Sequence, residues 1–163
     1  MSLAIGRLGL CFAFTVLVTS TPVLIAQNAK TAPPGPVPPQ IATAKKIFIA
    51  NAPGDIVPAA IGGNYRPYDQ FYAGVKSWGK YELVSSPADA DLIFEISMRL
   101  SPDEPLLNLV ITDPKTRVPL WWFAEQIIQK PHVLGREKVT DAFDDAMAAL
   151  VDDVEKLKTG PAR

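Results

Sequence analysis

Cysteine and histidine are almost absent from this chain of 163 residues, which has one of each, Cys11 and His132. A single cysteine excludes a disulfide within the chain, and so few ligands exclude the Cys and His clusters that hold structural zinc. Neither residue lies in a recognisable nucleophile motif. The sequence therefore predicts no catalytic residue, no metal site and no cofactor.

An excess of charge of either sign is also lacking. The chain has 16 Lys and Arg against 17 Asp and Glu, which gives a net charge of −1. No basic field attracts a phosphate backbone, and no acidic excess keeps the chain unfolded. With 48% hydrophobic and 20% charged residues, the composition predicts one folded domain that does not bind nucleic acid.

Residues 1–26 have the order of a secretory signal peptide. They contain no acid and one base, Arg7, which precedes the apolar run of residues 8–18. We expect cleavage after Ala26 and export to the periplasm or the extracellular space. The alternative is an uncleaved membrane anchor, because residues 8–26 approach the length of a bilayer span although Pro22 interrupts them.

A proline-rich linker is expected over residues 27–44. Its centre, residues 31–40, reads TAPPGPVPPQ. Proline fixes φ and lacks an N–H donor, so this stretch predicts an extended polyproline II spacer rather than helix or sheet. A ligand for a PxxP-binding module is the alternative, but such modules are mainly intracellular.

Residues 45–158 are expected to fold, followed by a disordered tail over residues 159–163. Apolar alternation predicts strands at 45–51, 81–85, 92–100, 107–112 and 118–128, and helical spacing predicts helices at 68–78 and 140–157. The order β-α-β-β-β-β-α predicts an α+β domain, with two helices packed on one face of a four- to five-stranded, mainly antiparallel sheet. The other face is left to water or to a partner.

The expected core draws on both helices and the central strands. The aromatic spacing of residues 68–78 places one apolar face of that helix in the core. Six residues from the strands and the last helix are predicted to share this core: Phe94, Ile96, Leu109, Ile111, Leu150 and Val154.

Three stretches carry a family resemblance, in the order YDQFYAGVKSWGKYELVSSPADADLIFEISM, LNLVITDPKTRVPLWWFAE and DAFDDAMAALVDDVEKL. Together they resemble the small α/β domain of bacterial envelope proteins of the TolB amino-terminal, CsgG and LpoB type, over about residues 47–157. The closest likeness is to uncharacterised exported proteins with that layout. The resemblance implies an accessory, non-catalytic part of an envelope assembly.

The candidate partner-binding residues lie in the predicted strands. Glu95, Arg99 and Asn108 occupy the outward positions of two strands. Trp121 and Trp122 are adjacent in a third, so they point to opposite faces and cannot both serve one core. One of them is expected to be either a partner-binding aromatic or a ring covered by the loop at residues 52–67.

These observations favour a non-catalytic binding or scaffold domain whose partner is an envelope protein or a cell-wall component. The alternative is a small carboxylate-dependent hydrolase, which requires Asp55, Asp69 and His132 to converge beside the loop at residues 54–65. Asp89 and Asp91 lack the remaining ligands of a calcium loop and are interpreted as turn residues.

Overall fold

The computed structural model describes residues 36–101, 105–132, 135–136 and 138–159. The predicted signal peptide, the first half of the predicted linker and all but the first residue of the predicted tail lie outside these ranges. Within them, no helix is both long and apolar enough to cross a membrane.

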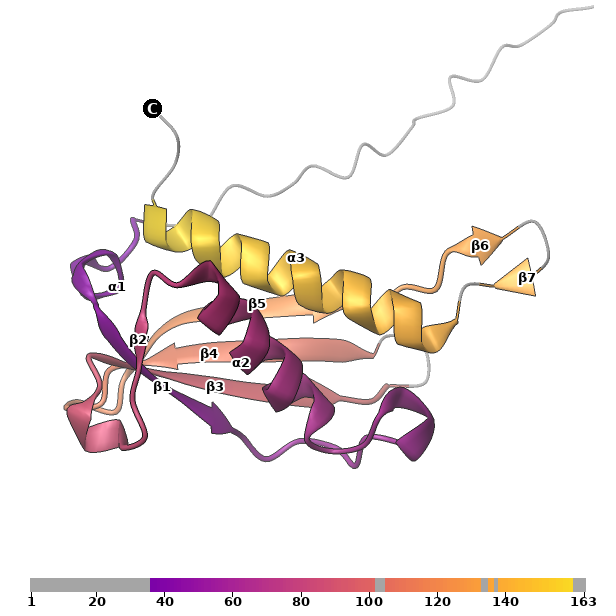
Figure 1. The fold of residues 1–163 in the computed structure, drawn as a ribbon, viewed down its shortest axis with the longest axis horizontal. Coiled ribbons are helices and arrows are strands. Elements are labelled where there is room, and N and C mark those ends of the chain that lie inside the picture. Colours follow the sequence, from indigo (N-terminus) through magenta and orange to yellow (C-terminus); the bar gives the residue numbers. More distant parts are fainter. Residues whose placement is uncertain (1–35, 102–104, 133–134, 137, 160–163) are drawn as a thin grey trace, which may run out of the picture. The chain divides into compact units, whose positions relative to one another are not determined.

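A five-stranded sheet forms the centre of the fold (Figure 1). Its strands, in the spatial order β2-β1-β3-β4-β5, are β1 (Lys46–Asn51), β2 (Glu82–Leu83), β3 (Leu92–Arg99), β4 (Leu106–Thr112) and β5 (Pro119–Gln126). A separate hairpin, β6 (Pro131–His132) and β7 (Gly135–Arg136), stands where the sequence predicts a loop.

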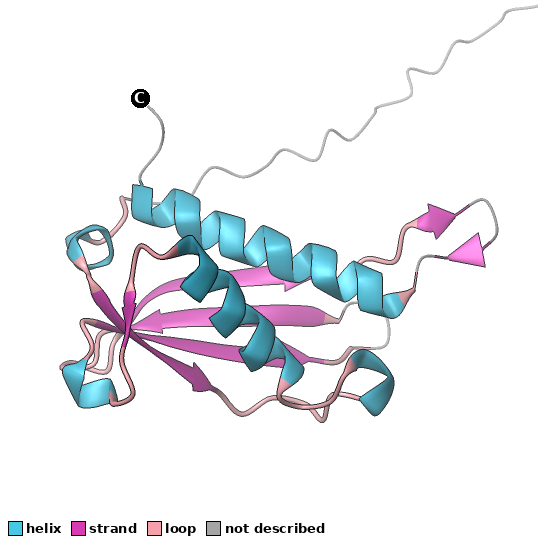
Figure 2. Cartoon of the chain, viewed as in Figure 1, coloured by secondary structure: helices cyan, strands magenta, loops and turns pink. Residues whose placement is uncertain are grey.

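Two helices cover one face of this sheet (Figures 1 and 2). α2 (Arg66–Trp78) packs against β1 and β3, and α3 (Val139–Thr159) packs against β4, β5 and α2. Two short 3₁₀ turns, η1 (Ala59–Ile61) and η2 (Pro87–Asp89), lie in the connections. The α+β class with two helices on one face of the sheet is confirmed.

The sheet is mixed rather than mainly antiparallel. β1 pairs in parallel with both β2 and β3, whereas β3–β4 and β4–β5 are antiparallel. α2 follows β1 and carries the chain back to the end of the sheet where β1 begins. β2 therefore runs in the same direction as β1. The connection through η2 does the same for β3.

The folded domain begins earlier than the sequence predicts. α1 (Pro39–Thr43) is a short helix that begins within the last two residues of the stretch expected to be extended. Its Ile41 is buried in the core. Proline is well suited to the first turn of a helix, because its fixed φ is helical and its missing N–H has no partner there in any case. The prediction of an extended conformation through Gln40 is therefore wrong at its last two residues.

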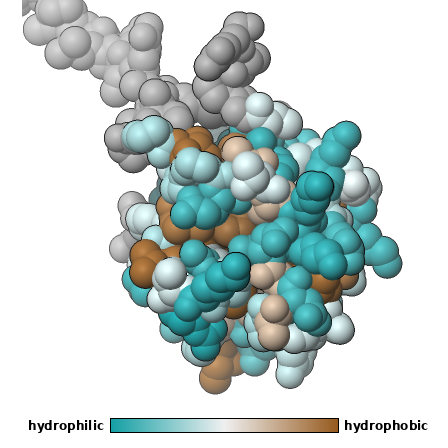
Figure 3. All heavy atoms as spheres, turned by 90° about the vertical axis from the view of Figure 1, so that its left-hand side faces the viewer, coloured by the Kyte–Doolittle hydropathy of each residue, from teal (hydrophilic) through white to brown (hydrophobic). Residues whose placement is uncertain are grey.

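Lys158, near the end of α3, holds α1 in place. Its Nζ donates to the carbonyl oxygens of Ala42, at 2.8 Å, and of Ala44. A cation at the carbonyl end of a helix satisfies groups that have no partner within the helix. Figure 3 views the molecule from this end and shows hydrophilic side chains with smaller apolar patches between them.

The predicted core is confirmed. All six residues named from the sequence belong to one buried cluster with the apolar face of α2. Phe71 and Val75 of α2 are fully buried, and the phenyl ring of Phe71 lies 6.3 Å from that of Phe94 in β3. α2 ends at Gly79, whose φ of 70° is the left-handed conformation that glycine adopts at the end of a helix.

Candidate functional site

The face of the sheet turned away from the helices is the candidate site, and we call it the open face. Strand register aligns its side chains in rows across β3, β4 and β5. The rows are Glu95–Val110–Trp122, Ser97–Asn108–Ala124 and Arg99–Leu106–Gln126. Three of the predicted partner-binding residues, Glu95, Asn108 and Arg99, therefore lie on one face, one in each row.

The two adjacent tryptophans point to opposite faces of the sheet, as neighbouring residues of a strand do. Trp122 lies opposite Val110 on the open face, and 63% of its surface is exposed. Trp121 lies opposite Ile111 on the helix side, where it is half-buried with its ring 6.4 Å from that of Phe123. The open face thus includes Trp122 and not Trp121.

Glu95 is held in place by a neighbouring strand. Thr112, which is 6% exposed, donates from Oγ1 to Oε2 of Glu95 at 2.9 Å. A hydroxyl donor leaves the carboxylate its charge and fixes its direction. At the other end of β3, Arg99 is exposed and makes no ion pair with any described residue. The open face therefore includes an oriented carboxylate at Glu95 and, at Arg99, a guanidinium that pairs with no acid in the described part of the chain.

Two apolar pairs on the open face were missed by the sequence reasoning. Phe48 of β1 lies beside Ile93 of β3, and Val110 lies beside Trp122. Alternation in residues 45–51 already separates Phe48 from its buried neighbours Ile47 and Ile49. The sequence gives no sign that β1 lies next to β3, and only this pairing places Phe48 on the same surface as Trp122.

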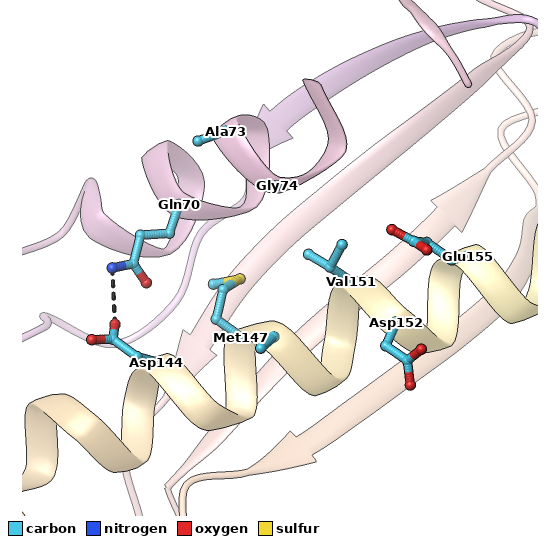
Figure 4. A pocket seen from close by; sticks show the side chains of 9 residues that line it. Gln70, Ala73, Gly74, Asp144, Met147, Val151, Asp152 and Glu155 are labelled. Atoms are coloured by element: carbon cyan, nitrogen blue, oxygen red, sulfur yellow. Dashed lines mark hydrogen bonds between the residues drawn. The ribbon is translucent and has the colours of Figure 1, made fainter. Parts of the chain in front are cut away.

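A groove of about 470 Å³ lies between α2 and α3 (Figure 4). Met147 and Val151 line its floor, and Gln70 and Asp144 lie at one end. Asp144 Oδ1 accepts from Gln70 Nε2 at 2.9 Å and from the Arg66 guanidinium at 2.5 Å. Arg66 and Gln70 thus occupy the Asp144 carboxylate, and the groove has a shallow apolar floor with a second carboxylate, that of Glu155, along its wall.

The carboxylate of Asp55, required by the hydrolase alternative, has a structural partner. Its Oδ2 accepts the backbone N–H of Leu100 at 2.6 Å, which ties the loop after β1 to the end of β3. Gly54 permits this approach, because a Cβ there would lie 2.5 Å from the carbonyl oxygen of Met98. Asp69 is exposed on α2, and the side chain of His132 lies outside the described part of the structure.

Asp91 lies in the bend between η2 and β3, as predicted, but its carboxylate bonds to a distant segment instead of its own turn. Its Oδ2 accepts the backbone N–H groups of Lys45 and Lys46 at 2.8 and 2.9 Å. These two donors, that of Lys45 foremost, hold the pKa of the Asp91 carboxyl below its usual value. In the described ranges, no three His, Cys, Asp or Glu side chains lie close enough together to hold a metal ion.

Comparisons with protein-family models and with curated proteins found no relative. No protein-family model matches the chain, and no curated protein matches it either. The candidate function therefore rests on the chemistry of the open face: an exposed aromatic ring beside Val110, an oriented carboxylate, and a guanidinium that makes no ion pair within the described ranges.

Proposed function

We propose that this chain is a non-catalytic, exported binding domain whose open face docks an envelope protein or a cell-wall component. The observation that carries the proposal is Trp122, a large aromatic side chain 63% exposed on a regular strand. Exposed aromatic rings are enriched at interfaces, where burying one can contribute about 2 kcal/mol or more. A strand fixes the direction of each Cα–Cβ bond, so the ring is directed to the open face before a partner binds.

The surroundings of Trp122 suit a partner of mixed character. Val110 extends the apolar area around Trp122, Phe48 adds a second apolar point on β1, and Glu95 and Arg99 add opposite charges at separate points. Charges at the rim of an interface select among partners and orient them more than they strengthen binding. The partner surface that fits therefore combines apolar area opposite Trp122 with groups of both charge signs.

Export is the second part of the proposal. The charge and apolar pattern of residues 1–26 supports it, and so does the resemblance to accessory domains of envelope proteins. The proline-rich stretch that follows would then act as a spacer between the domain and its point of attachment or exit.

The test is a pull-down from an envelope fraction with the purified protein as bait, comparing wild type with Trp122→Ala. We expect the variant to lose most of a captured partner while its melting temperature stays nearly unchanged. Tyr65→Ala is the matched control, because Tyr65 is also an aromatic residue and is 70% exposed away from the sheet. Equal capture by wild type and Trp122→Ala would contradict the proposal.

A further inference from the structure

β5 is an edge strand whose outer side has no partner strand among the described residues. The direction of its backbone groups follows from one hydrogen bond, in which the N–H of Ile127 donates to the carbonyl of Pro105 in the β4–β5 ladder. In an antiparallel pair, alternate residues point their N–H and C=O groups toward the same neighbour. Trp121, Phe123 and Glu125 therefore bond to β4.

The residues between them point their backbone groups outward. Trp122, Ala124 and Gln126 present three N–H donors and three C=O acceptors at the free edge of the sheet. The strand is regular here, since its irregularity lies further up, opposite Ile111 and Thr112. A regular edge with unsatisfied backbone groups and an exposed aromatic ring is a template for adding another strand.

We propose that two copies of this chain pair through β5, antiparallel, with Ala124 on the twofold axis. In this register Ala124 lies opposite the partner's Ala124, and Trp122 lies opposite the partner's Gln126. All three outward-pointing residues of each copy then find partners. Both open faces end up on the same side of a continuous ten-stranded sheet, because opposed residues of an antiparallel pair share a face.

The side chains favour this register over its neighbours. Glu125 lies opposite the partner's Phe123, whereas a shift of one position toward the carboxyl end would set the two Glu125 carboxylates against each other. A shift of one position the other way would move the axis to Phe123 and leave Gln126 opposite residues in the irregular part of the strand. The small Ala124 side chain also leaves room for each Trp122 ring across the seam.

A second copy of the chain fits this edge because the outward residues of β5 are complementary to themselves when two such strands pair antiparallel. The outward set has a large aromatic residue at one end, a small residue at the centre and an amide at the other end. Antiparallel pairing about the centre therefore places each large ring against a flexible amide. Such an isologous contact closes after two copies and leaves no free β5 edge for further addition.

Cysteine crosslinking of the full chain tests the register. In a Cys11→Ser background, Ala124→Cys should form a disulfide-linked dimer under mild oxidation, because paired Cα atoms lie about 5.5 Å apart at a hydrogen-bonded position. Trp122→Cys and Gln126→Cys are matched controls that should not crosslink to themselves, since each lies about 13 Å along the strand from its own copy. Mixed together, these two variants should crosslink to each other.

If Ala124→Cys dimerises no faster than Gln126→Cys, the proposed register is wrong and the proposal fails. Sedimentation of the full chain supplies an independent measure. Ala124→Pro removes an outward N–H and should abolish the dimer while leaving the bonds between β5 and β4, whereas Ala124→Val keeps the N–H and should preserve it. A wild-type monomer, or a dimer that survives Ala124→Pro, would overturn the proposal.

These outcomes are separable from the proposed binding function. A wild-type monomer that still captures its partner through Trp122 would refute dimerisation alone. A dimer with normal crosslinking that captures nothing would refute the binding function and leave the dimer standing.

Discussion

At the scale of single residues, Tyr81 combines good packing with an unsatisfied polar atom. Its ring makes edge-to-face contacts with Trp78 and Phe94, at 5.4 and 5.7 Å between centroids. The ammonium of Lys158 lies 5.0 Å from the centre of the same ring. The hydroxyl is buried without a hydrogen-bond partner among the described residues. The ring therefore stabilises the core, while its oxygen has lost the water that it would bond in the unfolded chain.

Replacing Tyr81 with phenylalanine should stabilise the protein. Tyr81→Phe keeps the aromatic contacts and removes the unpaired hydroxyl, so we expect the free energy of unfolding to rise by about 1 kcal/mol. Chemical denaturation measures this change. Tyr65→Phe, at an exposed position, is the control and should have little effect. A destabilised Tyr81→Phe variant would mean that the hydroxyl has a partner in solution.

The same residue should make the fold sensitive to alkali. Burial raises the pKa of Tyr81 from 10.0 to about 12, so the folded state holds the proton more tightly than the unfolded state does. Compared with high pH, the folded state therefore has its full stability below pH 10. This stability is lost as the pH rises toward 12, because the unfolded chain then gives up the Tyr81 proton more readily than the folded chain does. The difference in melting temperature between wild type and Tyr81→Phe should therefore change across this range. A constant difference would argue against a buried hydroxyl.

Asp91 should contribute stability with the opposite dependence on pH. Asp91→Ala leaves the N–H groups of Lys45 and Lys46 without their acceptor, and we expect a loss of about 1 kcal/mol at neutral pH. Because the pKa of Asp91 is lowered in the folded state, its contribution is present above the unfolded pKa of about 3.9 and disappears as the pH falls through the folded value. Wild type and variant should therefore converge in acid, as thermal melts can show.

At the scale of elements, α2 and α3 are in close contact where Gly74 faces Val151. A Cβ built on Gly74 would lie 2.9 Å from Cγ2 of Val151. Glycine inside a helix is unfavourable by about 1 kcal/mol relative to alanine, so its position here is explained by this contact. Figure 4 shows the bare backbone of Gly74 opposite the Val151 side chain.

A double-mutant cycle should reveal this contact. In the wild-type background, Gly74→Ala should bring little or no stabilisation, because the new methyl group meets Val151. In a Val151→Ala background the clash is relieved, and the same substitution should stabilise by about 1 kcal/mol through helix propensity. Urea unfolding of the four proteins gives the coupling energy. Additive effects would show that the two helices do not constrain each other here.

Elements with a strong local pattern were predictable from the sequence. β3 alternates apolar and polar residues and α2 carries aromatic residues at helical spacing, and both elements formed where expected. α1 was not predicted, because its proline content signals extended chain and its helix is stabilised by contacts distant in sequence, from Lys158 and the core. The parallel placement of β1 was likewise missed, since it depends on how α2 and η2 direct the chain.

The candidate site was predictable in part for the same reason. Alternation showed that Trp121 and Trp122 face opposite ways and that Glu95 and Arg99 share a face. It did not show which tryptophan is exposed, because that depends on where α3 packs and on the irregular register opposite Ile111. Phe48 joined the site only through strand pairing, which no local pattern encodes.

At the scale of the whole molecule, the proposed export makes a prediction about the mature chain. If residues 1–26 are a signal peptide, the exported protein should begin near Gln27, and its mass should be that of residues 27–163. Intact mass spectrometry of periplasmic or secreted material measures this directly. Recovery of the full-length chain from membranes only would replace cleavage with the anchor alternative.

The position of β1 has a mechanical consequence. A load that reaches the fold through the chain ahead of α1 must first detach α1 from Lys158 and then draw on β1. β1 lies between β2 and β3, so its hydrogen bonds run across the direction of pull on both sides. Bonds arranged in this way are strained together in shear instead of opening one after another. With a partner held on the open face, the sheet would resist tension between that partner and the chain ahead of α1.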